Sequence, residues 1–361
     1  MNNQQWKLAR TPLEGWPTPG DFDLSLGAMP EPERDQCCAR TIYLSMDPYQ
    51  WGRRRSGVEA VGDVCHGRTV SQVVQSRLGE FQEGDLIFNT NGWQEYGLVG
   101  KDISVFNYMF PRKIDPGLAP ISTAIGVLGM LGLTAYSGVY LQCKPQVGET
   151  AVVSAASGGV GQNAGQIAKI KGCRVVGIAG SEEKCRFVTD TLGFSACINR
   201  RDENFPDQLA QACPDGIDIY FENVGGAVYE TVLPLLNRES RITLCGMISQ
   251  YGNQEGDSAA STWRETGEAT FSKQNVTVHG LFVGNFVNEY QDQFLAEMSG
   301  WIQDGLVKYK EDLWQGIEQA HDAFSAMLMG GNFGKTIVQV GEDPTLDEKT
   351  KLHREGDNVL A

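Results

Sequence analysis

The stretch TAVVSAASGGVGQNAG, residues 150–165, decides the fold of this 361-residue chain. An apolar run at 151–155 predicts a buried parallel strand, and the end of the stretch has the apolar spacing of a helix. Between them, Gly159, Gly161 and Ala164 form the pattern G-x-G-x-x-A. Glycine permits the tight turn and the close approach of a pyrophosphate, and a small third residue lets helix and strand pack. The stretch therefore predicts the first unit of a dinucleotide-binding fold, with phosphates held at the helix N-terminus.

Strands and helices alternate after this stretch. Further strands are predicted at 173–179, 196–199, 217–223, 241–247 and 276–282, with helical segments between them. This alternation predicts a parallel, doubly wound sheet that binds ligands at the carboxyl ends of its strands. For the glycine motif at 150–165, the alternative to a dinucleotide-binding turn is an ordinary glycine-rich turn in another α/β protein. The polar segment 253–272 has no clear period and is expected to form a mobile loop on the substrate side.

Residues 1–128 are interpreted as a β-rich, barrel-like domain, because short strand candidates are separated by turn residues. A last strand at 335–340 is expected to return to this domain, so that residues 300–340 belong with it. The Rossmann-type domain then covers residues 129–299. The polar tail, 341–361, is expected to be a surface extension.

Composition excludes several classes of partner. The formal net charge is −15, which argues against nucleic acid. The nine cysteines are scattered, which is typical of reduced thiols inside the cell. No apolar run approaches the ~20 residues of a membrane span, and the N-terminus has no apolar segment of the signal-peptide type. A cytoplasmic protein without membrane partners is expected.

The end of the second strand of the dinucleotide-binding unit favours NADPH over NADH. A carboxylate at this point would bind the ribose 2′-hydroxyl and repel a 2′-phosphate. The segment 177–181 contains no acid there, and Lys184 and Arg200 supply local positive charge. Glu182 and Glu183 argue in the other direction, although acidic side chains also suit a helix N-terminus.

No metal site is expected. A catalytic zinc requires Cys, His or carboxylate ligands with an open position, and a structural zinc requires closely spaced cysteines. Cys65 and His66 are adjacent, but no third ligand is evident among the four histidines. His66 is therefore interpreted as a loop or core residue, and the basic run at 53–55 as a solvated surface segment.

Eight motifs, in order along almost the whole chain, carry a resemblance. They are YLSMDPYQWGR (43–53), GVLGMLGLTAYSG (126–138), AASGGVG (155–161), KIKGCRVVGIAGSEEKCRF (169–187), GIDIYFENVGG (216–226), CGMISQYG (245–252), HGLFV (279–283) and GNFGKTIV (331–338). Together they resemble the zinc-free medium-chain dehydrogenase/reductase family. More narrowly, they resemble its NADPH-dependent curcumin reductases, leukotriene/prostaglandin reductases and alkenal double-bond reductases. The resemblance implies a GroES-like β-barrel domain with an inserted Rossmann domain.

The resemblance also implies a set of site residues. Tyr251 matches the tyrosine that faces the substrate carbonyl, and Tyr49 matches an aromatic residue that lines the cleft, so both are expected to be catalytic. The expected NADPH contacts are Pro48, Thr134, Ser157, Gly158, Gly159, Val160, Gly161, Gly180, Ser181, Lys184, Arg200, Asn223, Cys245, Phe282, Val283 and Asn332.

The chain departs from the family pattern on the substrate side. Gln50 and Trp51 stand where the family motif DPYMRGRM has Met and Arg, and a large apolar Trp51 is expected to reshape the substrate pocket. Arg68 stands in place of the second glycine of a pair, and Gly252 replaces an Asn after the tyrosine. The resemblance therefore does not specify the substrate.

The expected reaction is reduction of a C=C bond conjugated to a carbonyl, with hydride added to the β-carbon and a proton to the α-carbon, and without a metal. Enones, enals, curcumin-like compounds and secondary metabolites are the expected substrate class. A zinc-free quinone oxidoreductase and a redox-silent NADPH-binding protein remain as alternatives. The family is often dimeric, so a homodimer is compatible with the resemblance.

Overall fold

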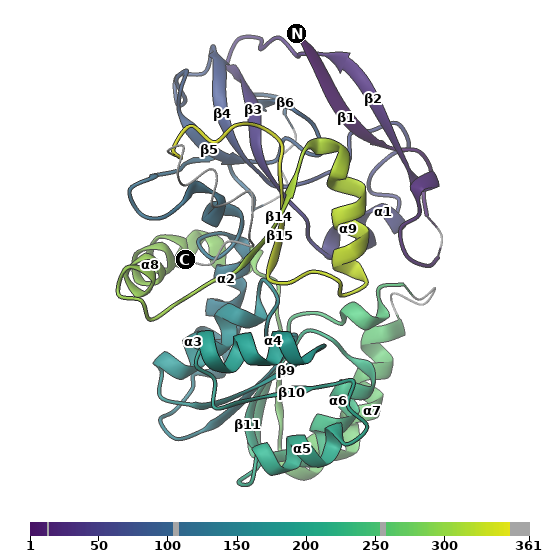
Figure 1. The fold of residues 1–361 in the computed structure, drawn as a ribbon, viewed down its shortest axis with the longest axis vertical. Helices are drawn as coiled ribbons and strands as arrows, with labels where there is room; N and C mark the ends of the chain where they lie inside the picture. Colours follow the sequence, from purple (N-terminus) through teal and green to yellow (C-terminus); the bar gives the residue numbers. More distant parts are fainter. Residues whose placement is uncertain (13, 104–107, 253–257, 347–361) are drawn as a thin grey trace. The chain divides into compact units, whose positions relative to one another are not determined.

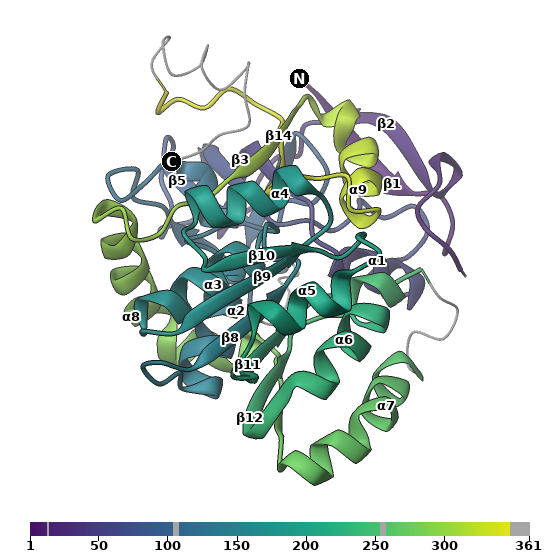
Figure 2. The ribbon, with the colours of Figure 1, turned by 60° about the horizontal axis from the view of Figure 1, so that its bottom comes forward.

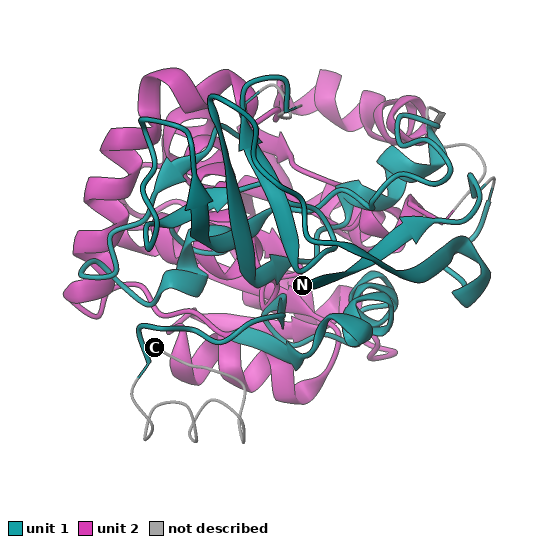
Figure 3. Ribbon diagram, turned by 90° about the horizontal axis from the view of Figure 1, so that it is seen from above, with its two compact units in different colours: residues 1–129, 311–360 teal, residues 130–310, 361 magenta. Residues whose placement is uncertain are grey.

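The computed structural model describes residues 1–12, 14–103, 108–252 and 258–346. The chain forms two compact units, which Figure 3 shows in different colours. Unit 1 consists of Met1–Gly129 together with Glu311–Leu360, and unit 2 of Met130–Lys310. Two segments far apart in the sequence therefore fold together in unit 1.

Unit 2 contains a six-stranded sheet in which every neighbouring pair is parallel (Figure 2). The strands in spatial order are β10 (Ala196–Asn199), β9 (Arg174–Ala179), β8 (Thr150–Ser154), β11 (Ile217–Glu222), β12 (Leu236–Leu244) and β13 (Thr277–Gly280). The chain proceeds outward from β8 to β10 and then returns to β11 on the other side of β8. This reversal confirms the predicted doubly wound sheet and creates a switch point, where such sheets bind ligands.

Helices connect these strands. They are α3 (Gly161–Ile170), α4 (Glu182–Arg186), α5 (Phe205–Ala212), α6 (Gly226–Val232), α7 (Ser258–Gln274) and α8 (Gly284–Gln303), with the short segments η4 (Phe187–Thr191), η5 (Leu233–Leu235) and η6 (Ile248–Gln250). Before β8, α2 (Met130–Tyr136) continues directly into the π-helical η3 (Ser137–Cys143). Gly138 lets η3 approach the sheet, because an added Cβ would lie 2.7 Å from the ring of Phe221.

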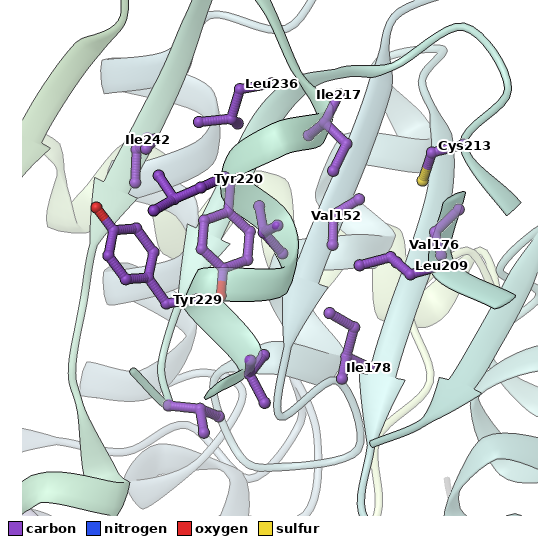
Figure 4. Close-up of a cluster of buried hydrophobic side chains, with 14 of the residues drawn as sticks. Val152, Val176, Ile178, Leu209, Cys213, Ile217, Tyr220, Tyr229, Leu236 and Ile242 are labelled. Carbon is purple, nitrogen blue, oxygen red and sulfur yellow. The ribbon is translucent and has the colours of Figure 1, made fainter. Parts of the chain in front are cut away.

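One hydrophobic cluster of unit 2 packs strand side chains against residues of α5, α6 and α7. Figure 4 shows part of this cluster. Val152, Val176 and Ile178 contribute strand side chains, and Leu209 contributes one from α5. Because side chains alternate along a strand, Tyr220 joins this cluster while its neighbour Phe221 faces η3. The near-continuous apolar strands predicted from the sequence are thus those of a sheet covered on both faces.

The predicted loop at 253–272 is wrong for the part that the structure describes. Residues 258–274 form α7, and residues 253–257 lie outside the described residues. Trp263 is buried and stacks on Tyr229, with ring centroids 4.4 Å apart, and the Tyr229 hydroxyl donates to the Trp263 carbonyl oxygen. Gly267 lies beside the same tyrosine. Tertiary packing around one tryptophan therefore stabilises a helix whose surface pattern is weak.

Unit 1 is built on a largely antiparallel sheet (Figure 1). Its spatial order is β14 (Glu311–Gln315), β15 (Lys335–Gln339), β3 (Gln36–Ser45), β4 (Thr69–Ser76), β5 (Leu86–Asn89) and β7 (Arg112–Lys113), and β6 (Tyr96–Gly100) pairs with β3. β1 (Asn2–Leu8) and β2 (Phe22–Ala28) form a separate antiparallel pair. The predicted return of the last strand is confirmed, because β15 pairs with β3.

Short helices complete unit 1. They are α1 (Tyr49–Arg55), α9 (Ala320–Leu328), η1 (Pro19–Asp21), η2 (Ile121–Ile125) and η7 (Ile317–Gln319). The start of the polar tail differs from the predicted surface extension. Asp343 is buried, and its Oδ2 accepts a hydrogen bond from the Tyr43 hydroxyl at 2.8 Å. The tail beyond residue 346 lies outside the described residues.

Within the described residues, every helix is too short or too polar to cross a bilayer. All nine cysteines fall in the described part of the chain, and each is a free thiol.

Candidate functional site

The glycine turn after β8 brings the chain from the sheet into α3. Ala155 has φ = 49°, a left-handed conformation that is uncommon for a residue with a side chain. A Cβ added at Gly161 would overlap the carbonyl oxygen of Ala155, so glycine is required where the helix begins. Gly165, one turn later, packs against the ring of Phe194. The close approach that the motif predicts is therefore present.

Four of the predicted phosphate-binding residues form this turn. Ser157 is buried, whereas Gly158, Gly159 and Val160 are partly exposed. The first N–H groups of a helix have no acceptors within the helix, and they point toward its N-terminal end. Here that end lies at the carboxyl end of β8, where backbone donors and the helix dipole favour an anion.

A basic cluster lies at the carboxyl end of β9. Ser181 caps α4, because its Oγ accepts a hydrogen bond from the backbone N–H of Lys184 at 3.3 Å. A Cβ added at Gly180 would lie 3.8 Å from Nε of Arg200, so that guanidinium lies beside the glycine. Partial desolvation of the guanidinium and the neighbouring Arg201 lower the pKa of Arg200, although the residue as a whole is exposed. Glu182 accepts a hydrogen bond from the Asn199 side chain at 3.1 Å, which gives this carboxylate a role in the helix start.

The carboxyl ends of β8 and β11 are joined by hydrogen bonds. The Asn223 side chain donates to the carbonyl oxygen of Ser154 at 2.7 Å, and the Asn223 backbone N–H donates to the Ser154 hydroxyl. Glu222 is buried, and its Oε1 accepts from the Ser154 hydroxyl and from the N–H groups of Val224 and Gly225. Burial raises the pKa of this carboxyl despite those donors. Asn223 is thus held in one orientation.

Tyr251 lies beside the ends of β11 and β12, at the end of η6. A Cβ added at Gly246 would lie 3.0 Å from the Tyr251 hydroxyl, so the phenol occupies the space that a side chain would take. The N–H groups of Cys245 and Gly246 both donate to the Glu222 carbonyl oxygen at 3.0 Å. Burial, reinforced by Cys245, raises the pKa of Tyr251 to about 12. The phenol is therefore protonated at neutral pH and can donate a hydrogen bond.

Three further predicted cofactor contacts in unit 2 have different surroundings. The Thr134 hydroxyl donates to the Met130 carbonyl oxygen within α2, at 2.6 Å. Phe282 follows β13 and is 52% exposed. Val283 is buried at the start of α8. Of these three, Phe282 offers an apolar surface to a ligand.

In unit 1, Tyr49 begins α1 directly after Pro48, and both residues are partly exposed. The Tyr49 hydroxyl and His66 Nε2 are hydrogen-bonded at 2.8 Å, with the rings arranged edge to face. Burial and the charges of neighbouring arginines lower the pKa of His66 to about 3, so the imidazole is neutral. Burial raises the pKa of Tyr49.

A buried charge cluster lies behind this pair. Asp47 accepts from the Ser45 hydroxyl at 2.6 Å and forms ion pairs with Arg68 at 2.5 Å and with Lys335 at 3.2 Å. The three charged side chains are at most 4% exposed. Burial alone would raise the pKa of Asp47, but Arg68 and Lys335 hold it well below its usual range. Burial lowers the pKa of Lys335 to about 8 despite Asp47.

Two interpretations of this region are wrong. The basic run at 53–55 is not a solvated segment, because Arg54 is fully buried, forms an ion pair with Glu59 at 3.3 Å and lies over the Trp93 ring. Trp51 is also fully buried, packs against Phe324, and donates from Nε1 to the Gly15 carbonyl oxygen. It is a core residue of unit 1 rather than a wall of an open pocket. The last predicted contact, Asn332, donates to the Gly334 carbonyl oxygen.

Known proteins resemble this chain along nearly its whole length. Residues 159–300 match the family described as zinc-binding dehydrogenase, and residues 4–105 match the N-terminal domain of oxidoreductase. The chain is 40% identical over 348 residues to the NADPH-dependent curcumin reductase of Escherichia coli strain K12. This match covers 95% of this chain and 98% of the relative. It is 36% identical over 354 residues to the NADP(+)-dependent 2-alkenal reductase of Nicotiana tabacum, with 95% and 99% covered. CurA from Vibrio vulnificus, solved in complex with NADPH, superposes with a TM-score of 0.84 at 40% identity, covering 94% of this chain and 100% of that one.

The chain belongs to the medium-chain dehydrogenase/reductase family. Its branch is that of the curcumin, prostaglandin and 2-alkenal reductases, and the chain is therefore an oxidoreductase. The expected architecture is also confirmed, with unit 1 as the GroES-like domain and unit 2 as the Rossmann-type domain.

The described residues of this medium-chain reductase contain no group of three or more His, Cys, Asp or Glu that could hold a metal ion. Cys65 and His66, which the sequence analysis considered as possible metal ligands, make other contacts. The His66 ring bonds to Tyr49, and the Cys65 thiol is buried with its pKa raised to about 11 by burial.

Sequence reasoning missed the chemistry that surrounds Tyr49 in this family member. His66 was interpreted as a loop or core residue, and Lys335 was seen only as the start of a strand. Arg68 was noted as a departure without a role. The residue type of Lys335 was the available signal. A lysine in an otherwise apolar strand is buried only when it has a partner, so it predicts a carboxylate nearby, which is Asp47.

Proposed function

We propose that this protein is an NADPH-dependent reductase of the C=C bond in α,β-unsaturated carbonyl compounds. The observation that carries the proposal is the placement of Tyr251, a protonated phenol at the carboxyl edge of the unit 2 sheet. The names of the relatives support the same chemistry, since they include curcumin and 2-alkenal reductases. The substrate class is that of small enones and enals.

The carboxyl edge of unit 2 fits a dinucleotide phosphate. Gly161 leaves no room for a side chain at the helix start, and Lys184 and Arg200 place positive charge at the end of β9. The proposed NADPH ligands in unit 2 are Thr134, Ser157, Gly158, Gly159, Val160, Gly161, Gly180, Ser181, Lys184, Arg200, Asn223, Cys245, Phe282 and Val283. Pro48 and Asn332 are the proposed ligands in unit 1. When bound, NADPH supplies the hydride that is added to the β-carbon of the substrate.

Tyr251 is the proposed hydrogen-bond donor to the substrate carbonyl oxygen. Negative charge collects on that oxygen as the β-carbon is reduced, and a fixed donor stabilises the resulting enolate. With its pKa raised to about 12, the phenol keeps its hydrogen throughout the neutral range. Addition of a proton to the α-carbon then gives the saturated carbonyl product.

The test follows loss of absorbance at the nicotinamide band with NADPH and with NADH, across enones, enals, curcuminoids and quinones. We expect NADPH consumption with enones or enals and a saturated product identified by mass. Turnover with quinones alone would instead indicate a quinone oxidoreductase. Binding of NADPH without turnover of any acceptor would identify a redox-silent binding protein and overturn the proposal.

Tyr251→Phe separates the proposed donor from a packing residue. Removal of one fixed donor to a developing oxyanion lowers kcat by about 10²–10³-fold, and we expect a loss in this range with NADPH affinity retained. Tyr290→Phe, on α8, is the matched control and should leave kcat unchanged. An unchanged kcat in Tyr251→Phe would remove this residue from the mechanism.

A further inference from the structure

Glu182 and Glu183 are acidic residues beside the proposed 2′-phosphate site, and the proposed function does not use them. A carboxylate that follows the second strand of such a sheet binds the ribose 2′-hydroxyl of NADH and repels the 2′-phosphate of NADPH. Glu182 is the first residue of α4 and lies three residues after Ala179, where β9 ends. The direction in which this carboxylate is held therefore bears on the choice of cofactor.

The Glu182 carboxylate accepts a hydrogen bond from the neighbouring strand. Asn199 is the last residue of β10 and pairs with Ala179, the last residue of β9. Its Nδ2 donates to Oε1 of Glu182 at 3.1 Å. The contact joins the start of α4 to the carboxyl end of β10, and both elements can be followed in Figure 2.

Three hydrogen bonds fix the Asn199 amide. Its Oδ1 accepts from the backbone N–H of Arg201 at 3.1 Å, so the other terminal atom, Nδ2, must be the donor. Besides the bond to Glu182, Nδ2 donates to Oδ1 of Asp202, also at 3.1 Å. The amide cannot rotate without breaking these bonds, so it presents a donor of constant direction to Glu182.

The alternation of side chains along β10 separates this carboxylate from the proposed phosphate site. Ile198 packs against the hydrophobic cluster of α5, α6 and α7, so Asn199 faces the opposite side of the sheet, where it meets α4. Arg200 follows on the face of Ile198, and its Nε lies 3.8 Å from a Cβ added at Gly180. Asn199 thus holds Glu182 on the side of the sheet away from the Arg200 guanidinium.

We propose that Asn199 is a positioning residue that determines the preference for NADPH, because it holds the Glu182 carboxylate away from the 2′-phosphate site. The inference rests on the NADPH site of the proposed function and deepens it. Without Asn199, the exposed carboxylate can turn toward Gly180. There it would repel a 2′-phosphate and accept a hydrogen bond from the adenosine ribose 2′-hydroxyl of NADH.

The experiment measures the affinity of the full chain for NADPH and for NADH by titration of cofactor fluorescence, without a substrate. In Asn199→Ala we expect about a threefold loss of NADPH affinity and about a threefold gain of NADH affinity, the size of an exposed charge interaction. The ratio of the two affinities should therefore fall about tenfold. Adding Glu182→Gln to this variant should restore most of the NADPH preference, because a neutral amide does not repel the phosphate.

The single variant Glu182→Gln completes a double-mutant cycle. In the presence of Asn199 it should change the affinity ratio by less than about twofold, since the carboxylate is already held away and is screened by water and salt. An equal effect of Glu182→Gln with and without Asn199 would show that Asn199 does not control this carboxylate, and would overturn the inference. An unchanged ratio in Asn199→Ala would do the same.

A merely structural role of Asn199 gives a different result. If Asn199 only stabilised the turn after β10, Asn199→Ala would weaken both cofactors by the same factor, and the ratio would not move. Asp202→Asn tests the second carboxylate that Asn199 binds, and recovery of the ratio by this substitution in place of Glu182→Gln would also overturn the inference. Asn237→Ala removes a donor to Asp218 elsewhere in unit 2, and this matched control should leave the ratio unchanged.

Because the test uses binding alone, its failure and that of the proposed function are distinguishable. If the wild type reduces enones with NADPH while Asn199→Ala keeps the same affinity ratio, the inference is wrong and the proposed function stands. If the cycle behaves as expected but no acceptor is reduced, the inference stands and the reductase proposal fails. If the wild type binds NADH as tightly as NADPH, both fail.

Discussion

The glycine turn of unit 2 offers backbone N–H groups, whereas the polar groups behind Tyr49 in unit 1 are buried, charged side chains. The glycine turn and the start of α3 present N–H groups that need only small residues around them, such as Gly161 and Gly165. Around Tyr49, polarity comes instead from Asp47, Arg68 and Lys335, whose charges are removed from water. A site made of backbone groups is disrupted by a substitution that causes steric overlap. A buried charge cluster is destabilised by a substitution that removes one charged partner.

The ion pairs of the two units provide the sharpest form of this contrast. Asp47 is buried with two cations, whereas Glu149 in unit 2 forms an ion pair with Arg241 in which both side chains are about one-fifth exposed. Removing one partner of a buried pair costs about 3–5 kcal/mol. A partly exposed pair is partly screened by water, and its loss costs about 1 kcal/mol or less.

The largest expected effect is therefore that of Asp47→Asn on the free energy of unfolding. We expect a loss of about 3–5 kcal/mol, because Arg68 and Lys335 would be left buried without a counter-charge. Glu149→Gln is the matched control and should lose about 1 kcal/mol or less. Denaturant unfolding monitored by tryptophan fluorescence measures both. Similar losses in the two variants would remove the distinction between the units.

The free energy of unfolding at acidic pH provides a second test of the Asp47 cluster. Asp47 has a pKa below that of an unfolded aspartate, about 3.9, so its contribution is present above pH 4 and is lost as pH falls further. His66, with a pKa lowered to about 3, is neutral in the fold but binds a proton in the unfolded chain below about pH 6.5. Stability should thus fall as pH decreases from 6.5 toward 3. His66→Gln should flatten that slope, and Asp47→Asn should flatten it below pH 4.

The second prediction breaks the backbone site of unit 2. In Gly161→Ala the new methyl group would overlap the Ala155 carbonyl oxygen, and the turn must shift. Forced shifts of this kind cost about 1–3 kcal/mol, and they also move the N–H groups that we expect to bind phosphate. NADPH affinity, measured by calorimetry, should fall. Gly300→Ala, on α8, has open space at the added Cβ and is the control that should leave affinity unchanged.

The same contrast explains how far the sequence could be interpreted. The turn at Gly161 and the alternating strands obey local rules of spacing and residue size, and the sheet of unit 2 was predicted from them. The cluster of Asp47 with Lys335 joins positions 288 residues apart, and only the fold brings them together. The helix α7 was missed for a related reason, because its stability depends on Trp263 packing against Tyr229.

His66 and Trp51 are residues whose surroundings could not be predicted from the sequence. Residue type alone suggested an unremarkable histidine and a tryptophan lining the pocket. In the fold, the histidine bonds to Tyr49 and the tryptophan is a core residue of unit 1. Their positions are set by contacts with distant segments, and no local pattern of either side chain reports such contacts.

The smallest expected effect concerns Arg200, whose side chain is a proposed NADPH ligand of unit 2. This arginine lies beside Gly180 on an exposed edge, so its charge acts through water more than the buried charges of unit 1 do. A hydrogen bond to a charged group contributes about 1.5–3 kcal/mol, and exposure places the effect at the lower end. Arg200→Ala should therefore weaken NADPH binding about tenfold and leave NADH binding nearly unchanged, as measured by titration of cofactor fluorescence. The neighbouring exposed Arg201 is the matched control, and Arg201→Ala should change neither affinity. If both variants lose NADPH affinity equally, the preference for NADPH over NADH comes from diffuse charge at this edge. If only Arg200→Ala loses affinity, this one side chain recognises the 2′-phosphate, which the backbone of unit 2 cannot do.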